Sequence, residues 1–153
     1  MNQVKIKKIE RTEEPPFDLL LLADPSMEVI KSYIERGICY ALEKENKIIG
    51  VYVLIETRPL TYELVNIAID SKHQGNGYGK MMIFDAIEKA KSFGAKVLEV
   101  GTGNSGISQL ALYQKCGFKI KGIDHDFFKR HYSEKIIENG IECIDMIRLS
   151  MDF

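Results

Sequence analysis

The chain is poor in cysteine and histidine, which argues against disulfides and metal sites. Its three cysteines are odd in number and far apart, at Cys39, Cys116 and Cys143. No Cys-x-x-Cys pair occurs, so the sequence predicts neither a disulfide framework nor a zinc site, and buried free thiols are expected. The three histidines also lack the i, i+4 spacing that a helical metal site uses. No metal is therefore expected.

The chain also lacks an excess of positive charge and a long apolar segment. Its formal net charge is −1, with no dense basic stripe interleaved with aromatic residues, so nucleic acid is not an expected partner. No apolar run approaches the roughly 18 residues of a membrane span. The first residues alternate Val4, Ile6 and Ile9 with lysines, unlike the apolar core of a signal peptide. A cytoplasmic protein with no membrane contact is expected.

What the chain does have is enough apolar sequence for one core. It contains 153 residues, of which 45% are hydrophobic. A domain of this size buries roughly two-thirds of the surface of its unfolded chain. No internal repeat, low-complexity tract or interdomain linker is found. A single domain over residues 1–153 is expected.

Hydrophobic patterns and turn residues predict alternating strands and helices. Strands are expected at 4–9, 38–43, 48–55, 62–69, 97–100, 118–123 and 141–149, and helices at 18–23, 25–36, 79–93 and 107–116. The helix that begins at Pro25 takes Asp24 as its N-cap, and Glu45 with Asn46 forms a hairpin tip. The aromatic and charged segment 126–138 is expected to be a loop. This order predicts one α/β unit.

The most informative motif is Gln-Gly-Asn-Gly-Tyr-Gly-Lys at 74–80, between a strand pattern and a helical pattern. Its alternate glycines, Gly75, Gly77 and Gly79, leave no Cβ to keep a ligand off the backbone, and the first N–H groups of the helix are free. Such a site favours phosphate. A Walker loop is excluded because the spacing differs and Met81 replaces the hydroxyl residue that must follow the lysine.

Two segments carry a resemblance to a known family. Gln74, Gly77 and Gly79 match the Gln/Arg-x-x-Gly-x-Gly/Ala signature of the GNAT superfamily of N-acetyltransferases, which the chain resembles. Residues 112–118, Leu-Tyr-Gln-Lys-Cys-Gly-Phe, are similar to the family's Leu-Tyr-x-Lys-x-Gly-Phe segment. The resemblance implies an α/β fold with a central mixed, mostly antiparallel sheet flanked by helices, whose strands splay at the cofactor site. It also implies an acyltransferase that uses acetyl-coenzyme A (acetyl-CoA).

The resemblance assigns most of the site to acetyl-CoA. The loop would hold the pyrophosphate, and the backbone of the preceding strand would hold the pantetheine arm and polarise the thioester. The residues so assigned are Ile67, Ala68, Ile69, Gln74, Gly75, Asn76, Gly77, Tyr78, Gly79 and Lys80. Tyr113 would contact acetyl-CoA and act as the general acid toward the departing thiolate, a transfer that suits a phenol. The alternative is that Tyr113 only anchors its helix to the sheet.

Two further roles remain to be filled by residues of this chain, a contact to the pantetheine arm and a catalytic base. The family often places an asparagine seven residues before the tyrosine, where this chain has Gly106. Asn104 is the candidate to bind the cofactor instead, with Ser105, Ser108 or Gln109 as substitutes, or else it caps the following helix. Glu63 is the candidate base; alternation places it on the face of Val65 and Ile67, or it is a solvated edge residue. Alternatives to Glu63 are Glu56, His125, Asp126 and Tyr132.

A second glycine run indicates a different function from the first. Residues 101–106 spell Gly-x-Gly-x-x-Gly between a strand and a helix, with Asp124 about 20 residues on, which is the dinucleotide-binding pattern. However, no second mononucleotide-binding half follows to complete a doubly wound sheet. A dinucleotide-binding protein and a non-catalytic CoA-binding module therefore remain as alternatives, and Tyr113 argues against the latter.

The expected reaction is direct transfer of the acetyl group to a primary amine, without an acyl-enzyme. A small cytoplasmic amine is the favoured acceptor, and a protein amino terminus or lysine is the alternative. The aromatic rings and carboxylates of the segment 126–138 suit a cationic amine, or the segment packs over the end of the sheet. The protein is expected to be a monomer or a homodimer.

Overall fold

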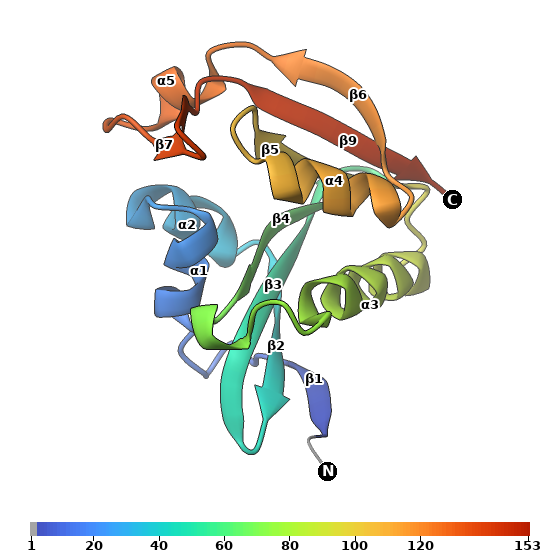
Figure 1. Cartoon of the computed structure of the whole chain (residues 1–153). Coiled ribbons are helices and arrows are strands. Elements are labelled where there is room, and N and C mark those ends of the chain that lie inside the picture. The colour runs from blue at the N-terminus through green and yellow to red at the C-terminus, as the bar shows by residue number, and fades with distance from the viewer. Residues whose placement is uncertain (1–2) are drawn as a thin grey trace.

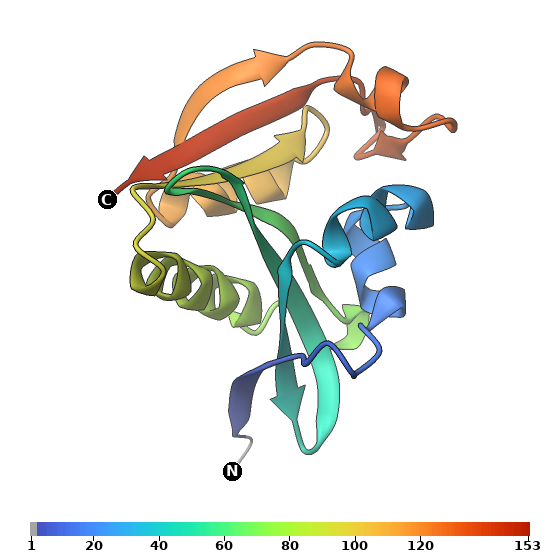
Figure 2. The ribbon, with the colours of Figure 1, turned by 180° about the vertical axis from the view of Figure 1, so that it is seen from behind.

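The computed structural model describes residues 3–153 as a twisted sheet with helices on both faces (Figures 1 and 2). The main sheet has seven strands in the order β1-β2-β3-β4-β5-β9-β6. They are β1 (Val4–Lys8), β2 (Ile38–Lys44), β3 (Lys47–Arg58), β4 (Thr61–Ile69), β5 (Val97–Gly103), β6 (Lys119–Asp124) and β9 (Met146–Asp152). β4 and β5 run parallel, whereas the other neighbouring pairs are antiparallel. The predicted mixed, mostly antiparallel sheet is confirmed.

The longer helices form two layers. α1 (Phe17–Ala23) and α2 (Met27–Ile34) lie on one face of the sheet, and α3 (Tyr78–Ser92) and α4 (Ile107–Lys115) on the other (Figure 1). A 3-10 helix, η1 (Ser71–His73), precedes α3. A short helix, α5 (Phe127–His131), and a separate hairpin of β7 (Ile137–Glu138) and β8 (Ile141–Glu142) stand beyond the end of the main sheet.

Strand β3 separates two hydrophobic cores. Its residues Val51, Val53 and Ile55 pack with Leu20 of α1 and Ile30 of α2. The residues between them, Tyr52 and Leu54, pack instead with the apolar face of α3. Because side chains alternate along a strand, a continuous apolar run can fill both cores at once. This explains why β3 lacks the polar and apolar alternation of a strand with one wet face.

The structure corrects five of the predicted elements. β3 continues to Arg58, three residues beyond the predicted end at 55. β5 continues to Gly103, three residues beyond the predicted end at 100. The predicted strand 141–149 is divided into β8 and β9. The predicted loop 126–138 contains α5 and β7. The hairpin tip is correct, since Glu45 and Asn46 both have positive φ angles, 52° and 64°, as a type I′ turn requires.

The fifth correction concerns the start of α2. Ser26 is its N-cap, with Oγ accepting the Val29 N–H at 3.2 Å. Asp24 ends α1 instead, and its backbone N–H donates to the Leu20 carbonyl at 3.1 Å. Serine and aspartate cap helices about equally well, so propensity does not distinguish them. The Asp24 carboxylate is thereby left to bind residues from other elements.

Strands β4 and β5 pair only in their first halves. The register runs from Thr61 opposite Val97 to Leu64 opposite Val100. Against β3, the register of β4 shifts between Leu64 and Asn66, which makes Val65 the extra residue of a β-bulge. Beyond this point the two strands are not paired with each other, so the β5-facing edge of β4 keeps free backbone groups. The predicted splay of the sheet is confirmed.

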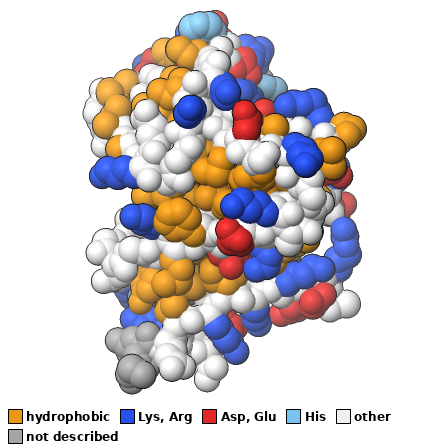
Figure 3. All heavy atoms as spheres, turned by 90° about the vertical axis from the view of Figure 1, so that its right-hand side faces the viewer, with side chains coloured by type: hydrophobic (Ala, Val, Ile, Leu, Met, Phe, Trp, Pro, Cys, Tyr) orange, Lys and Arg blue, Asp and Glu red, His pale blue; other side chains and the backbone are white. Residues whose placement is uncertain are grey.

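The surface carries charges of both signs. Figure 3 shows the side where α3 and the C-terminus lie, with Lys and Arg side chains interspersed with acidic and hydrophobic ones. Met81 and Phe84 of α3 are among the exposed hydrophobic residues of the protein. Within residues 3–153, no helix is long and apolar enough to cross a membrane. The same residues contain no group of three or more potential metal ligands of the His, Cys, Asp and Glu types.

Candidate active site

The glycine loop connects β4 to α3 through η1. Gly75 and Gly77 both have φ of 81°, a left-handed conformation that glycine adopts without strain. A Cβ at either position would meet no atom within 4 Å, so the loop is open on its outer side. Gly77 is the N-cap of α3, and no side chain caps this helix. The first backbone N–H groups of α3 are therefore free for an anion.

Two polar side chains fix the shape of this loop. Gln74 Nε2 donates to the Ile69 carbonyl at 3.1 Å, and Asn76 Nδ2 donates to the His73 carbonyl at 3.0 Å. His73 Nδ1 lies 3.2 Å from Asp70 Oδ2. The loop thus holds its own side chains against its backbone, so that its N–H groups remain directed outward for a ligand.

A cavity of about 640 Å³ opens beside the loop and is called the loop cavity here. The predicted cofactor residues that line it are Ile67, Ala68, Ile69, Gln74, Gly75, Gly77, Tyr78, Gly79, Lys80 and Tyr113. Asn76 and Asn104 are not among its lining residues. Ser108 and Gln109, which the sequence offers as substitutes for Asn104, line it from α4, whereas sequence reasoning missed Leu112 and Lys115 of the same helix. Leu112 and Lys115 follow Ser108 by four and seven residues, a helical spacing that would have found them.

A second cavity, of about 360 Å³, lies between α1, β4, β5 and the segment from α5 to β8, and is called the Asp24 cavity here. Its polar lining residues are Asp24, Asn66, Thr102, Gln109, Tyr132 and Glu138. Phe128 and Met146 contribute apolar surface. None of the predicted base candidates except Tyr132 lies in this lining. Asp24 and Glu138, its two carboxylates, were not predicted as site residues.

The two cavities meet at the splay between β4 and β5. Leu22, Ala23, Ile67, Gln109 and Tyr113 line both of them. Ile67 lies on β4 beyond the last residue paired with β5, so the gap between the strands connects the two faces of the sheet. Ligands bound in the two cavities would therefore meet beside Tyr113.

Tyr113 is the buried centre of this junction. Its side chain is 5% exposed and makes an edge-to-face contact with Phe118, with ring centroids 6.1 Å apart. Burial raises the pKa of the phenol to about 12, with the nearby Cys116 thiol as a smaller cause. At neutral pH the hydroxyl therefore keeps its proton and is able to donate it. The residue both anchors α4 to the sheet and reaches the two cavities.

The second glycine run belongs to β5 and does not form a phosphate-binding loop. Gly101 and Gly103 pair with Arg148 and Met146 of β9. A Cβ on Gly101 would lie 2.6 Å from Met146 Sδ, and one on Gly103 would overlap Cys143 Sγ. These glycines make room for side chains that line the Asp24 cavity. The dinucleotide-binding alternative is therefore wrong, because strand pairing occupies the backbone that would hold a pyrophosphate.

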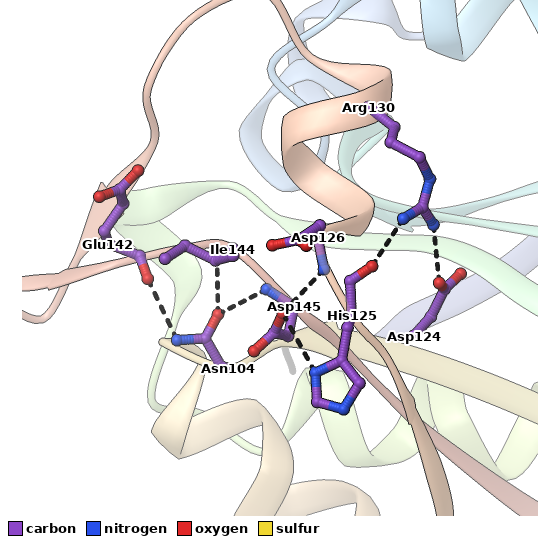
Figure 4. Close-up of polar contacts among 8 residues, drawn as sticks. All are labelled: Asn104, Asp124, His125, Asp126, Arg130, Glu142, Ile144 and Asp145. Carbon is purple, nitrogen blue, oxygen red and sulfur yellow. Dashed lines mark hydrogen bonds and ion pairs between the residues drawn. The ribbon is translucent and has the colours of Figure 1, made fainter.

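Asn104 binds the connection between β8 and β9 (Figure 4). Its Nδ2 donates to the Glu142 carbonyl at 3.1 Å, and its Oδ1 accepts the N–H groups of Ile144 and Asp145 at 2.8 and 3.0 Å. The N-cap of α4 is Gly106, without a side-chain bond, so Asn104 does not cap that helix either. The Asn104 amide is committed to this connection and the residue lines neither cavity, so its contact with acetyl-CoA stays a prediction.

The same connection positions α5. Asp145 Oδ1 accepts the Asp126 N–H at 2.8 Å and lies 3.7 Å from His125 Nδ1 (Figure 4). Arg130 donates to the His125 carbonyl and pairs with Asp124 at 2.7 Å. His125 and Asp126 are thus engaged in holding α5, which carries Phe128 into the lining of the Asp24 cavity.

Glu63 lies on β4 but lines neither cavity. The bulge at Val65 interrupts the alternation of side chains between the two faces of β4, because Val65 packs in the α1/α2 core whereas Leu64 and Ile67 both pack in the α3 core. The prediction that Glu63 shares a face with Ile67 is therefore wrong. Burial raises the pKa of its carboxyl, an effect that Arg148 partly offsets. Its catalytic role stays a prediction.

Comparison with known proteins identifies the family of the chain that carries the loop, the splay and Tyr113. The model of the family described as "Acetyltransferase (GNAT) family" matches residues 6–118. The chain belongs to the GNAT acetyltransferase family. It is 55% identical to the uncharacterized N-acetyltransferase YvbK of Bacillus subtilis (strain 168) over 152 residues, which cover 99% of this chain and 98% of the relative.

Two solved structures are similar over nearly the whole chain. An IAA acetyltransferase from Bacillus cereus ATCC 14579 superposes with a TM-score of 0.95 at 54% identity, covering 99% of this chain and 100% of the other. A GNAT family acetyltransferase from Elizabethkingia anophelis, with acetyl-CoA bound, gives 0.96 at 47% identity, with 98% of each chain covered. The GNAT protein described here is thus an acyltransferase that uses acetyl-CoA, as the sequence predicted.

Proposed function

We propose that this GNAT protein transfers the acetyl group of acetyl-CoA directly to a small primary amine bound in the Asp24 cavity. The observation that carries the proposal is the junction of the two cavities at Tyr113. A volume of about 360 Å³ suits a small molecule, since ligand pockets commonly measure about 300–1,000 Å³. The aromatic and acidic lining suits an amine that arrives as a cation.

The loop cavity fits acetyl-CoA. The uncapped N-terminus of α3 offers backbone N–H groups to the pyrophosphate, and Lys80 adds a positive charge. The unpaired edge of β4 at Ile67, Ala68 and Ile69 offers backbone groups to the amides of the pantetheine arm. Acetyl-CoA is a cytoplasmic metabolite, so a cytoplasmic location is part of the proposal.

Tyr113 supplies the proton that the reaction needs. The neutral amine attacks the thioester carbonyl, so that a C–N bond forms and the C–S bond breaks. The Tyr113 hydroxyl protonates the leaving sulfur, and the resulting phenolate takes the surplus proton from the new amide nitrogen. The hydroxyl is restored at the end of each turnover. No acyl-enzyme is formed, because the two ligands meet directly at the splay.

Glu63 remains the base that the sequence proposes, with the part of relaying through water the proton that the ammonium group gives up. Its raised pKa supports this role, but it would have to act through water because it lines neither cavity. Replacement Glu63→Gln removes the charge and keeps the shape. If Glu63 relays the proton, kcat should fall about 10-fold or more in this variant; an unchanged kcat would show that another group takes the proton.

Release of CoA thiol tests the proposed function. Purified protein and acetyl-CoA are mixed with n-butylamine, phenethylamine or spermidine, and in parallel with a peptide that has a free amino terminus and one with a single internal lysine. We expect at least one small amine to exceed both peptides in kcat/KM by about 10-fold or more. A preference for either peptide would favour a protein acetyltransferase, and no release with any amine would contradict the proposal.

A further inference from the structure

Asp24 is the most deeply buried carboxylate of the Asp24 cavity. Its side chain belongs to a residue that is 8% exposed, at the corner between α1 and α2. Three groups donate hydrogen bonds to it: the Tyr33 hydroxyl at 3.0 Å, the Tyr132 hydroxyl at 2.7 Å and the Ser26 N–H at 3.3 Å. These donors fix the carboxylate in place within the cavity wall.

This carboxylate has donors but lacks a counter-ion. Within residues 3–153, no Lys, Arg or His side chain forms an ion pair with Asp24. A buried carboxylate without a positive partner is unfavourable, because it loses hydration without gaining a compensating charge. A cation that enters the cavity would supply that partner.

The two phenols bind Asp24 as hydrogen-bond donors. Burial raises the pKa of both Tyr33 and Tyr132 above the usual range of a phenol. They therefore remain protonated, and each donates one hydrogen bond to the carboxylate. A carboxylate accepts about four hydrogen bonds, so capacity remains for an N–H group of a ligand.

Asn66 gives a second, independent indication. It is 4% exposed and lines the same cavity, and its Oδ1 has no hydrogen-bond donor among residues 3–153. Its Nδ2 donates to the Leu20 carbonyl at 3.1 Å and to the Tyr33 hydroxyl at 2.9 Å. Because a carbonyl cannot donate, Leu20 fixes which end of the amide is oxygen. The cavity wall thus contains an acceptor group that lacks an N–H partner.

We propose that Asp24 binds the ammonium form of the acceptor amine and takes its proton before the acetyl transfer. This inference rests on the proposed function and deepens it by naming the residue that recognises the acceptor. The ammonium N–H bond breaks, the proton forms an O–H bond with the Asp24 carboxylate, and the electron pair stays on nitrogen. The protonated carboxyl then releases its proton to solvent, so that one proton leaves per turnover and Asp24 is restored.

Calorimetric titration of matched probes tests the inference. The protein is first saturated with CoA, which has no acetyl group to transfer. Phenethylamine is then compared with 2-phenylethanol, and n-butylamine with 1-butanol, at neutral pH. In at least one pair, the wild-type protein should bind the ammonium probe about 10-fold or more tightly than its alcohol. Equal affinity in both pairs would overturn the proposal.

Two variants then locate the charge. Asp24→Asn keeps the shape of the side chain and should lose the preference for the ammonium probe, with the affinity for CoA unchanged. Glu138→Gln is the matched control, because Glu138 lines the same cavity but is exposed, and this variant should keep the preference. If Asp24→Asn binds the ammonium probe as tightly as wild type, Asp24 is not the recognition group.

If Asp24→Asn does not fold, the Glu138→Gln variant still tests whether Asp24 recognises the ammonium group. A preference that survives Glu138→Gln leaves Asp24 as the remaining carboxylate of the cavity lining, whereas a preference lost in Glu138→Gln overturns the proposal. The failure of the proposed function has a different signature, which is the absence of CoA release from acetyl-CoA with every amine. Turnover of an amine with kcat/KM unchanged in Asp24→Asn would reject this inference alone.

Discussion

The Tyr132 hydroxyl donates a 2.7 Å hydrogen bond to the Asp24 carboxylate, across 108 positions of sequence. Tyr132 follows α5 and Asp24 follows α1, so this bond joins the N-terminal helices to the segment after β6 around one cavity. The N-terminal helices and the segment after β6 are therefore parts of one site, although neither segment alone carries a recognisable motif.

Removing that bond should weaken the native state. We expect Tyr132→Phe to lower the free energy of unfolding by about 1 to 2 kcal/mol, because a buried hydrogen bond to a charged acceptor is lost. Urea denaturation measures it. Tyr62→Phe is the control, since Tyr62 stacks on Phe93 and its hydroxyl has no hydrogen bond among the described residues. Equal losses in the two variants would show that the Asp24 bond contributes nothing.

The glycine loop predicts a charge effect at Gly79. A Cβ there would meet only Leu112 Cδ2, at 3.8 Å, so Gly79→Ala should fold normally and change the KM for acetyl-CoA little. Gly79→Asp adds a negative charge at the free end of α3 and should raise that KM about 10-fold or more, through repulsion of the pyrophosphate. Steady-state kinetics compares the two variants. Similar KM values would mean that the pyrophosphate lies elsewhere.

The strand glycines predict a packing effect at Gly103. A Cβ there would overlap Cys143 Sγ, so Gly103→Ala should destabilise the protein by about 1 to 3 kcal/mol. Gly122→Ala on β6 is the matched control, because a Cβ at that position meets nothing within 4 Å. The second substitution Cys143→Ala in the Gly103→Ala background should restore part of the loss. If Gly103→Ala is as stable as wild type, Cys143 does not pack closely against Gly103.

The buried phenols predict that stability falls in alkaline solution. Burial raises the pKa of Tyr113 to about 12 and also raises those of Tyr33, Tyr52 and Tyr132. An unfolded phenol has a pKa of about 10, so above that pH the unfolded state releases protons first and becomes favoured. The free energy of unfolding should be unaffected by these groups below about pH 10 and decrease above it. Urea titrations from pH 8 to 11 measure this, and a flat profile would contradict it.

Much of the fold is predictable from the sequence because local patterns and tertiary packing agree there. The strand at Thr61–Ile69, the glycine loop and α3 follow each other as expected, since apolar alternation, glycine conformations and helical periodicity are all local signals. The loop and Tyr113 share one cavity because both lie next to the splay. These are the parts that the family motifs cover.

The rest depends on contacts that no local pattern encodes. The bulge at Val65 changes which face Glu63 occupies, and a period-2 reading cannot detect one extra residue. The sequence presents Asp24 as a helix cap and does not show that Tyr33 of α2 and Tyr132, 108 positions away, donate hydrogen bonds to it. The sequence proposes Asn104 as a cofactor ligand but does not show that the connection between β8 and β9 binds its amide. The acceptor side of the site is built from such contacts, so the sequence does not predict it.

Tyr113, as the proton donor at the junction of the cavities, is central to the proposed transfer. The decisive measurement is the kcat of Tyr113→Phe with the best amine acceptor, together with the dissociation constant of acetyl-CoA for that variant. We predict that kcat falls by about 10²-fold or more while acetyl-CoA binding is unchanged, because only the donated proton is removed. A variant with the kcat of wild type would contradict the assignment of Tyr113 and with it the proposed course of the transfer.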